Sequence, residues 1–180
     1  MNKKELIKMG KHLAFLLRHD KDALDKKLIN EHGWRQVSEL VKDQGYTRKL
    51  LDDIVETNNK QRYEYNKEKT LIRARQGHSI NVDVELNEAT PPDVLFHGTQ
   101  KEALGGILEK GIIKGSRLYV HLSVDEDTAM NVGKRHGTPI ILTINTKQMH
   151  EDGIKFYLSN NNVWLTDHVE PKYIIEHKSC

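Results

Sequence analysis

The chain has 180 residues, of which 37% are apolar and 30% are charged, and its formal net charge is +2. This composition is that of a soluble globular protein, and it excludes collagen-like, low-complexity and disordered classes. The single cysteine, Cys180, excludes a disulfide framework and a thiolate zinc cluster and is typical of a reducing compartment.

No apolar run is long enough to cross a bilayer, and the first residues lack the continuous apolar core of a signal peptide. We therefore expect a cytoplasmic protein that does not contact a membrane. Charge is unevenly distributed: residues 1–80 carry 18 Lys and Arg against 12 Asp and Glu, and residues 81–180 carry 10 against 14. The basic half favours a polyanionic partner, although two halves of an average protein often differ this much.

The first half of the chain predicts helices. Leucine and methionine recur at helical spacing over residues 3–18, and Asn2 is expected to cap this helix. Ser38 and Thr47 are each expected to cap a further helix, and Gly45 is expected to end the first of these two.

A hairpin follows these helices. Residues 61–65 and 70–74 are two extended runs joined by a polar turn. Three helices followed by a hairpin is the order of a winged helix, which is a common nucleic-acid scaffold, although a fold alone does not give a function. We expect this lobe to span residues 1–80.

The second half predicts a β-rich α+β lobe over residues 94–180, after a linker at 81–93 that contains two consecutive prolines. Helices are predicted at 101–110, ending at Gly111, and at 125–134, ending near Gly133. Strands are predicted at 94–97, 118–122, 139–145, 154–158, 163–165 and 173–177.

The polar face of the first predicted helix carries four cations. Lys4, Lys8, Lys11 and Arg18 fall within about 80° of one another at 100° per residue, opposite the leucines. A solvated face is the more common explanation of such a pattern. The functional alternative is an anion site at the end of the helix, where Arg18 is followed by His19, because a guanidinium can grip a phosphate with two hydrogen bonds.

Other short motifs are individually weak. Arg73 and Arg75 share one face of a predicted strand, and in isolation they indicate an exposed, charged edge strand. Gly98 follows a strand in Phe96-His97-Gly98-Thr99, where a glycine lets the backbone approach a ligand. Arg117 and His121 are predicted on the same face of a strand that leads to Ser123.

Several chemistries have no support in the sequence. No glycine-rich dinucleotide loop after a strand, Walker loop, zinc-protease motif or EF-hand is present. The ten histidines show no tight ligand spacing with acidic or thiol partners, so we predict no metal site. A nucleophile elbow is also absent, which argues against a Ser/His/Asp hydrolase without excluding it.

In chain order, these motifs resemble the RNA 2′-phosphotransferase family over roughly residues 3–175. The matching segments are Leu16-Leu17-Arg18-His19, Asn59-Lys60-Gln61-Arg62-Tyr63, Gln76-Gly77-His78-Ser79, His97-Gly98-Thr99, Arg117–Ser123 and Asn162-Val163-Trp164-Leu165. One departure is the stretch Asp20-Lys21-Asp22-Ala23, which lacks a proline often found there in the family.

The resemblance implies a winged-helix RNA-binding lobe and an NAD⁺-binding lobe with the ADP-ribosyltransferase fold. It also implies an enzyme that removes an internal 2′-phosphate from RNA, such as a tRNA splice junction, with NAD⁺ as co-substrate. In the first implied step the phosphate attacks the NAD⁺ ribose and nicotinamide leaves, giving RNA-2′-phospho-ADP-ribose. In the second, the ribose 2″-OH attacks phosphorus and frees RNA with a 2′-OH and ADP-ribose 1″,2″-cyclic phosphate.

The resemblance also implies roles for residues. Matching positions for the phosphotransfer are Arg18, His19, Arg62 and Arg117, with Lys60 as a helper beside Arg62. The three-part NAD⁺ signature matches His97, His121 and, within a residue either way, Val163, where many relatives that modify proteins have glutamate. Further residues that could contact NAD⁺ are Gly98, Thr99 and Ser123, whereas plain strand packing is the alternative for Val163.

Two alternatives stay open at this point. One is an ADP-ribosyltransferase that acts on nucleic-acid phosphate ends and stops after nicotinamide release. The other is a non-enzymatic RNA-binding module that uses the basic half. We expect a monomer, because a single basic cleft between two lobes needs no second copy.

Overall fold

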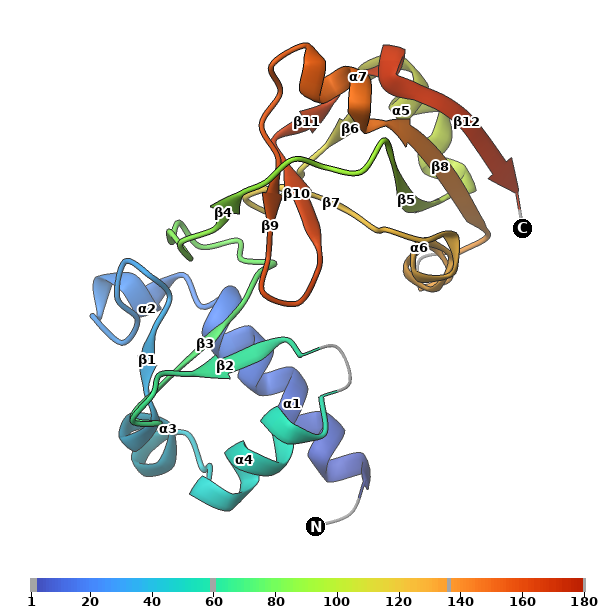
Figure 1. The fold of residues 1–180 in the computed structure, drawn as a ribbon. Coiled ribbons are helices and arrows are strands. Elements are labelled where there is room, and N and C mark those ends of the chain that lie inside the picture. The colour runs from blue at the N-terminus through green and yellow to red at the C-terminus, as the bar shows by residue number, and fades with distance from the viewer. Residues whose placement is uncertain (1–2, 59–60, 136, 180) are drawn as a thin grey trace. The chain divides into compact units, whose positions relative to one another are not determined.

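The protein is described by a computed structural model that covers residues 3–58, 61–135 and 137–179 (Figure 1). The chain divides into two compact units, Met1–Glu85 and Leu86–Cys180. The division falls inside the segment 81–93 that the sequence predicts as a linker. Among the described residues, no helix is both long and apolar enough to cross a membrane.

The first unit is built on the predicted first helix. The helix α1 spans Lys3–Arg18 and buries Leu13, Leu16 and Leu17 completely or nearly so. This stripe packs with apolar residues of α3 (Val37–Asp43) and α4 (Arg48–Glu56) in one core, and a short helix α2 (Asp22–Asp25) follows α1. The prediction for residues 3–18 is therefore confirmed, whereas its proposed cap Asn2 lies outside the described residues.

The predicted helix caps are confirmed in one case and wrong in the other. Thr47 Oγ1 accepts a hydrogen bond from Leu50 N at 3.1 Å, so Thr47 caps α4 as expected. Ser38 does not cap α3, because that helix already begins at Val37 and its N-cap Gln36 makes no side-chain cap bond. Gly45 follows the end of α3 with φ +72°, as a glycine after a helix commonly does.

The hairpin at the end of the first unit is confirmed. β2 (Tyr63–Tyr65) and β3 (Leu71–Ala74) pair in antiparallel register, with Tyr65 opposite Ile72. A short strand, β1 (Arg35–Gln36), adds to the other side of β3, so the sheet order is β1-β3-β2. The pairing of β1 with β3 was not predicted from the sequence, and it makes β3 the central strand.

The segment at the unit boundary is held on both sides. Asp83 N donates to the Glu31 carbonyl oxygen at 2.8 Å, and Val82 and Val84 are buried in the first unit. On the other side, β4 (Asn87–Glu88) pairs with a strand of the second unit. The predicted linker thus contains ordered structure that the turn signals at 89–92 did not reveal.

The second unit is rich in antiparallel sheet. Its sheets have the orders β4-β9-β10-β7, β12-β8-β5 and β11-β6. The elements after β4 are β5 (Val94–Gln100), η1 (Lys101–Ala103), α5 (Leu104–Lys110), β6 (Ile112–Ile113), β7 (Val120–Leu122), α6 (Glu126–Gly133), β8 (Pro139–Asn145), α7 (Thr146–Glu151), β9 (Tyr157–Leu158), β10 (Trp164–Thr166), β11 (His168–Val169), η2 (Pro171–Tyr173) and β12 (Ile174–Ser179).

Most predicted elements of this unit exist with shifted ends. β8 matches the predicted 139–145, and α6 follows the predicted 125–134 closely. The predicted strand at 118–122 begins only at Val120, because the preceding residues form a bend, and the helix at 101–110 begins with a 3-10 turn. The helix α7 and the short strands β6 and β11 were not predicted.

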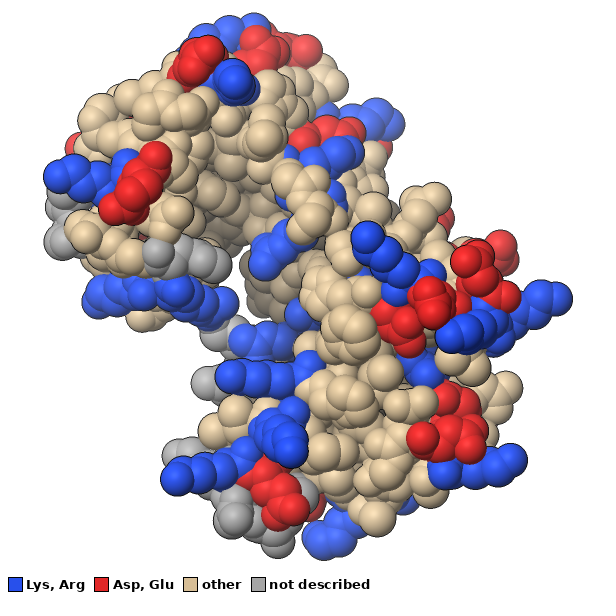
Figure 2. Space-filling view, turned by 180° about the vertical axis from the view of Figure 1, so that it is seen from behind, with Lys and Arg blue, Asp and Glu red and all other residues tan. Residues whose placement is uncertain are grey.

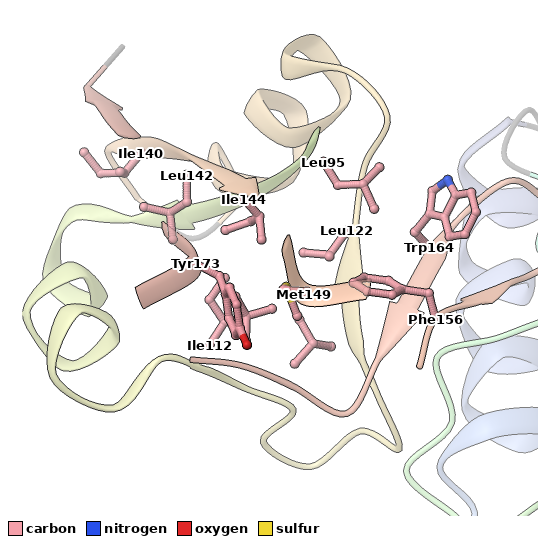
Figure 3. Packing of buried hydrophobic residues seen from close by; sticks show 12 residues of the cluster. Leu95, Ile112, Leu122, Ile140, Leu142, Ile144, Met149, Phe156, Trp164 and Tyr173 are labelled. Atoms are coloured by element: carbon pink, nitrogen blue, oxygen red, sulfur yellow. The ribbon is translucent and has the colours of Figure 1, made fainter. Parts of the chain in front are cut away.

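The second unit has its own apolar core. Figure 3 shows side chains from its different sheets converging on one interior, among them Leu95, Leu122, Leu142 and Ile144. All four are at most 1% exposed. Two separate cores and a mixture of helices with antiparallel sheets confirm the α+β class.

A glycine contact joins α6 to β5. A Cβ built on Gly98 would lie 1.7 Å from the Ala129 carbonyl oxygen, and one built on Gly133 would lie 2.7 Å from the Thr99 carbonyl oxygen. The backbones of the helix and strand therefore touch, which only residues without a side chain permit. This packing explains glycine at position 98 without a ligand, in contrast to the sequence-based interpretation of close ligand approach.

We predict that Gly98→Ala destabilises the protein by about 3 kcal/mol or more, since overpacking against backbone cannot relax by a side-chain rotation. Gly105→Ala is the matched control, because a Cβ on that exposed helical glycine meets nothing within 4 Å. This control is expected to stabilise by about 0.5–1 kcal/mol through helix propensity. Urea unfolding measures both changes, and equal stability of the two variants would contradict the packing argument.

Candidate functional site

The end of α1 is fixed by a segment from much later in the first unit. The Arg18 carbonyl oxygen accepts hydrogen bonds from Ser79 N at 2.9 Å and Ile80 N at 3.3 Å. The last carbonyl groups of a helix have no partner within the helix, so these bonds satisfy one of them. They also place residues 77–80 beside Arg18 and His19.

The side chain of His19 is oriented by Ser79. His19 Nδ1 lies 2.9 Å from Ser79 Oγ, and Ser79 Oγ also lies 3.4 Å from the Arg18 carbonyl oxygen. His19 is exposed. The contact of Nδ1 with Ser79 therefore fixes the orientation of the His19 imidazole at the end of α1.

Arg18 lies against a glycine and an aromatic ring. Gly77 has φ +85°, a conformation that favours glycine, and a Cβ there would be 3.6 Å from Arg18 Nη1. The Arg18 guanidinium carbon is 5.8 Å from the centre of the Tyr63 ring. The guanidinium is therefore positioned by packing on both the hairpin and the 77–80 segment.

Arg62 belongs to the same neighbourhood. It precedes Tyr63 directly, and its carbonyl oxygen accepts a hydrogen bond from Arg75 N at 2.9 Å. Burial raises the pKa of Tyr63, while the positive charges of Arg18 and Arg62 oppose this increase. Three sequence-predicted residues, Arg18, His19 and Arg62, thus gather in the first unit, whereas the suggested helper Lys60 lies outside the described residues.

A buried histidine lies beneath this cluster. His78 is 2% exposed, and its Nε2 atom has no hydrogen-bond partner among the described residues. Burial, together with the smaller effects of the charges of Arg18, His19 and Arg73, lowers the pKa of His78 to about 3. His78 is therefore neutral near pH 7. The sequence analysis included it in a motif but assigned no role to it or to Ser79.

The interpretation of Arg73 and Arg75 as an exposed edge is wrong. Arg73 is buried, and it bonds Glu64 at 2.7 Å and Glu85 at 2.9 Å while stacking 4.3 Å from the Trp34 ring centre. Arg75 Nε lies 3.1 Å from the other oxygen of Glu64. These cations stabilise the sheet through ion pairs, and β3 is its central strand.

In the second unit, the two predicted signature histidines are joined through the backbone. His97 Nδ1 lies 3.0 Å from the His121 carbonyl oxygen. A carbonyl oxygen only accepts hydrogen bonds, so His97 Nδ1 carries the proton. In the neutral ring, Nε2 then has a lone pair and accepts a hydrogen bond. Burial lowers the pKa of His97, partly offset by this hydrogen bond, and the charge of Arg117 lowers it further.

Arg117 lies next to His121 although it is not in the strand. Its Nη1 atom is 3.3 Å from His121 Nδ1. Because a guanidinium only donates, Nδ1 of His121 accepts and its proton sits on Nε2. Burial of the guanidinium lowers the pKa of Arg117, and the charge of Arg135, which sequence reasoning missed, lowers it further.

The remaining predicted positions lie on the same sheets. Thr99 pairs with Ile140 between β5 and β8, and the backbone of Ser123 pairs with Phe96. Val163 donates its N–H to Ser159 Oγ at 3.0 Å and lies just before β10, so the predicted strand at 163–165 is displaced by one residue.

An aromatic pair also lies near the signature and was not predicted. Register places His121 opposite Leu165, and Leu165 opposite Tyr157, so these three share a sheet face. The ring centres of Tyr157 and Tyr119 are 5.5 Å apart. Within the described part of the chain, no group of three or more His, Cys, Asp or Glu is arranged to hold a metal ion.

Comparison with known proteins gives a consistent result. The model of the RNA 2'-phosphotransferase, Tpt1 / KptA family matches residues 4–168. A probable RNA 2'-phosphotransferase of Flavobacterium johnsoniae is 47% identical over 97% of this chain and 98% of its own length. Proteins of the same description from Nostoc punctiforme (44%; 97% and 98%) and Escherichia coli (43%; 96% and 97%) are also similar.

The buried, neutral His78 predicts a pH dependence of stability. Its pKa is about 3 in the folded protein against 6.5 ordinarily, so the unfolded chain binds the proton first as the pH falls. This histidine therefore has little effect on folding stability above about pH 7 and removes about 2 kcal/mol of it between pH 7 and pH 5. Urea unfolding of His78→Asn should lose less stability over this range than the parent. His150→Asn, at an exposed position, is the control, and equal pH slopes for all three proteins would contradict the assignment.

Proposed function

The chain belongs to the RNA 2′-phosphotransferase family, and from this premise we propose that it removes an internal 2′-phosphate from RNA with NAD⁺ as co-substrate. The observation that carries the proposal is the gathering of Arg18, His19 and Arg62 in the first unit. Arg18 and His19 are adjacent at the end of α1, and the fold brings the hairpin that follows Arg62 to the same place, since the Arg18 guanidinium lies against the Tyr63 ring. They supply the donors that a phosphate dianion requires.

The proposed roles follow from the chemistry of the phosphate. A phosphate monoester carries nearly two negative charges and must be held in line with the carbon that it attacks. The guanidinium groups of Arg18 and Arg62 are proposed to bind and orient it. His19, oriented at Nδ1 by Ser79, is proposed to orient the phosphate or to move a proton during transesterification.

NAD⁺ would supply an electrophilic ribose carbon with nicotinamide as leaving group. The side chains at the proposed site fit such a ligand, because riboses and a pyrophosphate need both donors and acceptors. His97 offers an acceptor at Nε2 and His121 a donor at Nε2, while Thr99 and Ser123 add hydroxyl groups. A backbone contact of Gly98 with NAD⁺ stays part of the proposal, although the side of Gly98 that a Cβ would occupy faces the α6 backbone.

Val163 is proposed to keep the third signature position free of negative charge. A carboxylate beside an incoming phosphate dianion would repel it by several kcal/mol in a poorly solvated site, by an order-of-magnitude Coulomb argument. An apolar residue there permits a phosphate acceptor. This difference from relatives that carry glutamate supports phosphate over a protein side chain as the acceptor.

The lobe assignments are part of the proposal. The order α1, β1, α3, α4, β2, β3 and the sheet β1-β3-β2 support a winged-helix lobe. The antiparallel sheets that carry His97 and His121 support an ADP-ribosyltransferase lobe. We propose that a monomer acts on 2′-phosphorylated RNA.

An oligoribonucleotide with one internal 2′-phosphate tests the proposal. Incubated with the protein and NAD⁺, it should yield RNA with a 2′-OH, nicotinamide and ADP-ribose 1″,2″-cyclic phosphate, resolved by liquid chromatography and mass spectrometry. Without NAD⁺, no product is expected. A stable ADP-ribosyl adduct on the RNA would instead establish a transferase that stops after nicotinamide release, and binding without nicotinamide release would establish an RNA-binding module.

Variants of the first-unit cluster test the residue roles. His19→Ala and Arg62→Ala should each lower the single-turnover rate by about 10²-fold or more, as removal of a proton-transfer or charge-stabilising group does. His150→Ala, a change of the same residue type at an exposed site, should react at the parent rate. If both cluster variants react at the parent rate in both steps, the roles assigned to them are wrong.

A further inference from the structure

The outer face of α1 carries cations that the proposed reaction does not use. Lys4, Lys8 and Lys11 are exposed, and none of them forms an ion pair within the described residues. They share one face of the helix with Arg18. At 1.5 Å per residue, the stripe from Lys4 to Arg18 is about 20 Å long. Figure 2 shows Lys and Arg side chains gathered along one edge of the first unit.

An exposed aromatic ring lies within this stripe. Phe15 is 51% exposed, and at 100° per residue it falls between Lys8 and Lys11 in angle. Along the axis it lies one turn after Lys11 and one turn before His19. Single exposed apolar residues are ordinary, but this one stands among cations that lead to the phosphate cluster.

The next longest helix of the first unit, α4, offers no comparable surface. On α4, Arg48 is paired with Asp52 at 3.3 Å and Lys49 is near Asp53 at 3.8 Å. These pairs neutralise its cations in place. The cations of this unit that remain available to a polyanion along one continuous helix face are therefore those of α1.

We infer that the α1 face formed by Lys4, Lys8, Lys11 and Phe15 is a track for single-stranded RNA next to the 2′-phosphate. This inference rests on the proposed function. The lysines attract successive backbone phosphates, and the Phe15 ring stacks on an unpaired base. Evenly spaced cations with an interleaved aromatic ring are the recognition pattern of single strands. The surface selects an RNA that is unpaired beside its 2′-phosphate.

Two RNA substrates distinguish binding to the α1 track from binding to the phosphate cluster of Arg18, His19 and Arg62. One is a dinucleotide with a 2′-phosphate, and the other is the same dinucleotide with ten unmodified ribonucleotides on each side. Binding is measured by competition in fluorescence anisotropy over a range of NaCl concentrations, and turnover is measured separately. Because binding is read independently of turnover, a lack of reaction would overturn the proposed function and leave the track testable.

The charge variant is Lys4→Gln/Lys8→Gln/Lys11→Gln. Its salt slope for the long RNA should fall by about 2, since each phosphate contact on a single strand contributes about 0.7. Turnover of the dinucleotide should stay within twofold of the parent. The matched control, Lys27→Gln/Lys42→Gln/Lys67→Gln, removes the same charge from exposed sites off α1 and should keep the parent slope.

The aromatic variant is Phe15→Ala, which should weaken binding of the long RNA about tenfold through loss of stacking, whereas Phe15→Tyr should retain it. A fully paired RNA flank should show no effect of either change. The inference is overturned if the control triple weakens long-RNA binding as much as the α1 triple. It is also overturned if the α1 variants weaken the dinucleotide and the long RNA equally, or if Phe15→Ala binds like the parent.

Discussion

The carbonyl oxygen of Arg18 is the point on which the first unit's site depends. Two backbone N–H groups, from Ser79 and Ile80, bind this oxygen and fasten the segment that follows the hairpin to the end of α1. The same contact brings Ser79 Oγ to His19, Gly77 to the Arg18 guanidinium and His78 beneath both. Local helix formation places Arg18 and His19, but only this long-range junction fixes which way they face.

In the second unit, hydrogen bonds fix protonation as well as position. Since a carbonyl accepts from His97 Nδ1 and a guanidinium donates to His121 Nδ1, the two rings hold opposite tautomers. One ring thus presents an acceptor at Nε2 and the other a donor. The two imidazoles are therefore not interchangeable, and Arg117 maintains this difference from the bend before β7.

Local sequence patterns predicted the long helices and strands well. They failed where the surroundings of a residue are formed by residues distant in sequence. The periodic leucines of α1, the Thr47 cap and the 61–74 hairpin depend on neighbours a few residues away. The two-residue strands β1 and β6 exist only through their pairing partners. The sequence around Arg73 is typical of an exposed strand, because it does not show that Glu64 and Glu85 pair with this residue in the fold. Gly98 was read as a ligand contact because nothing in the sequence shows that α6 lies against it.

The fastening of the chain at both ends of residues 82–88 decides where the molecule can be shortened. Ending the first unit at residue 80 would delete the buried Val82 and Val84 and the Glu85 carboxylate that pairs with Arg73. Starting the second unit at residue 94 would remove β4 and leave the outer edge of β9 without its partner strand. A fragment that keeps the core of one unit intact must therefore end or begin next to Leu86.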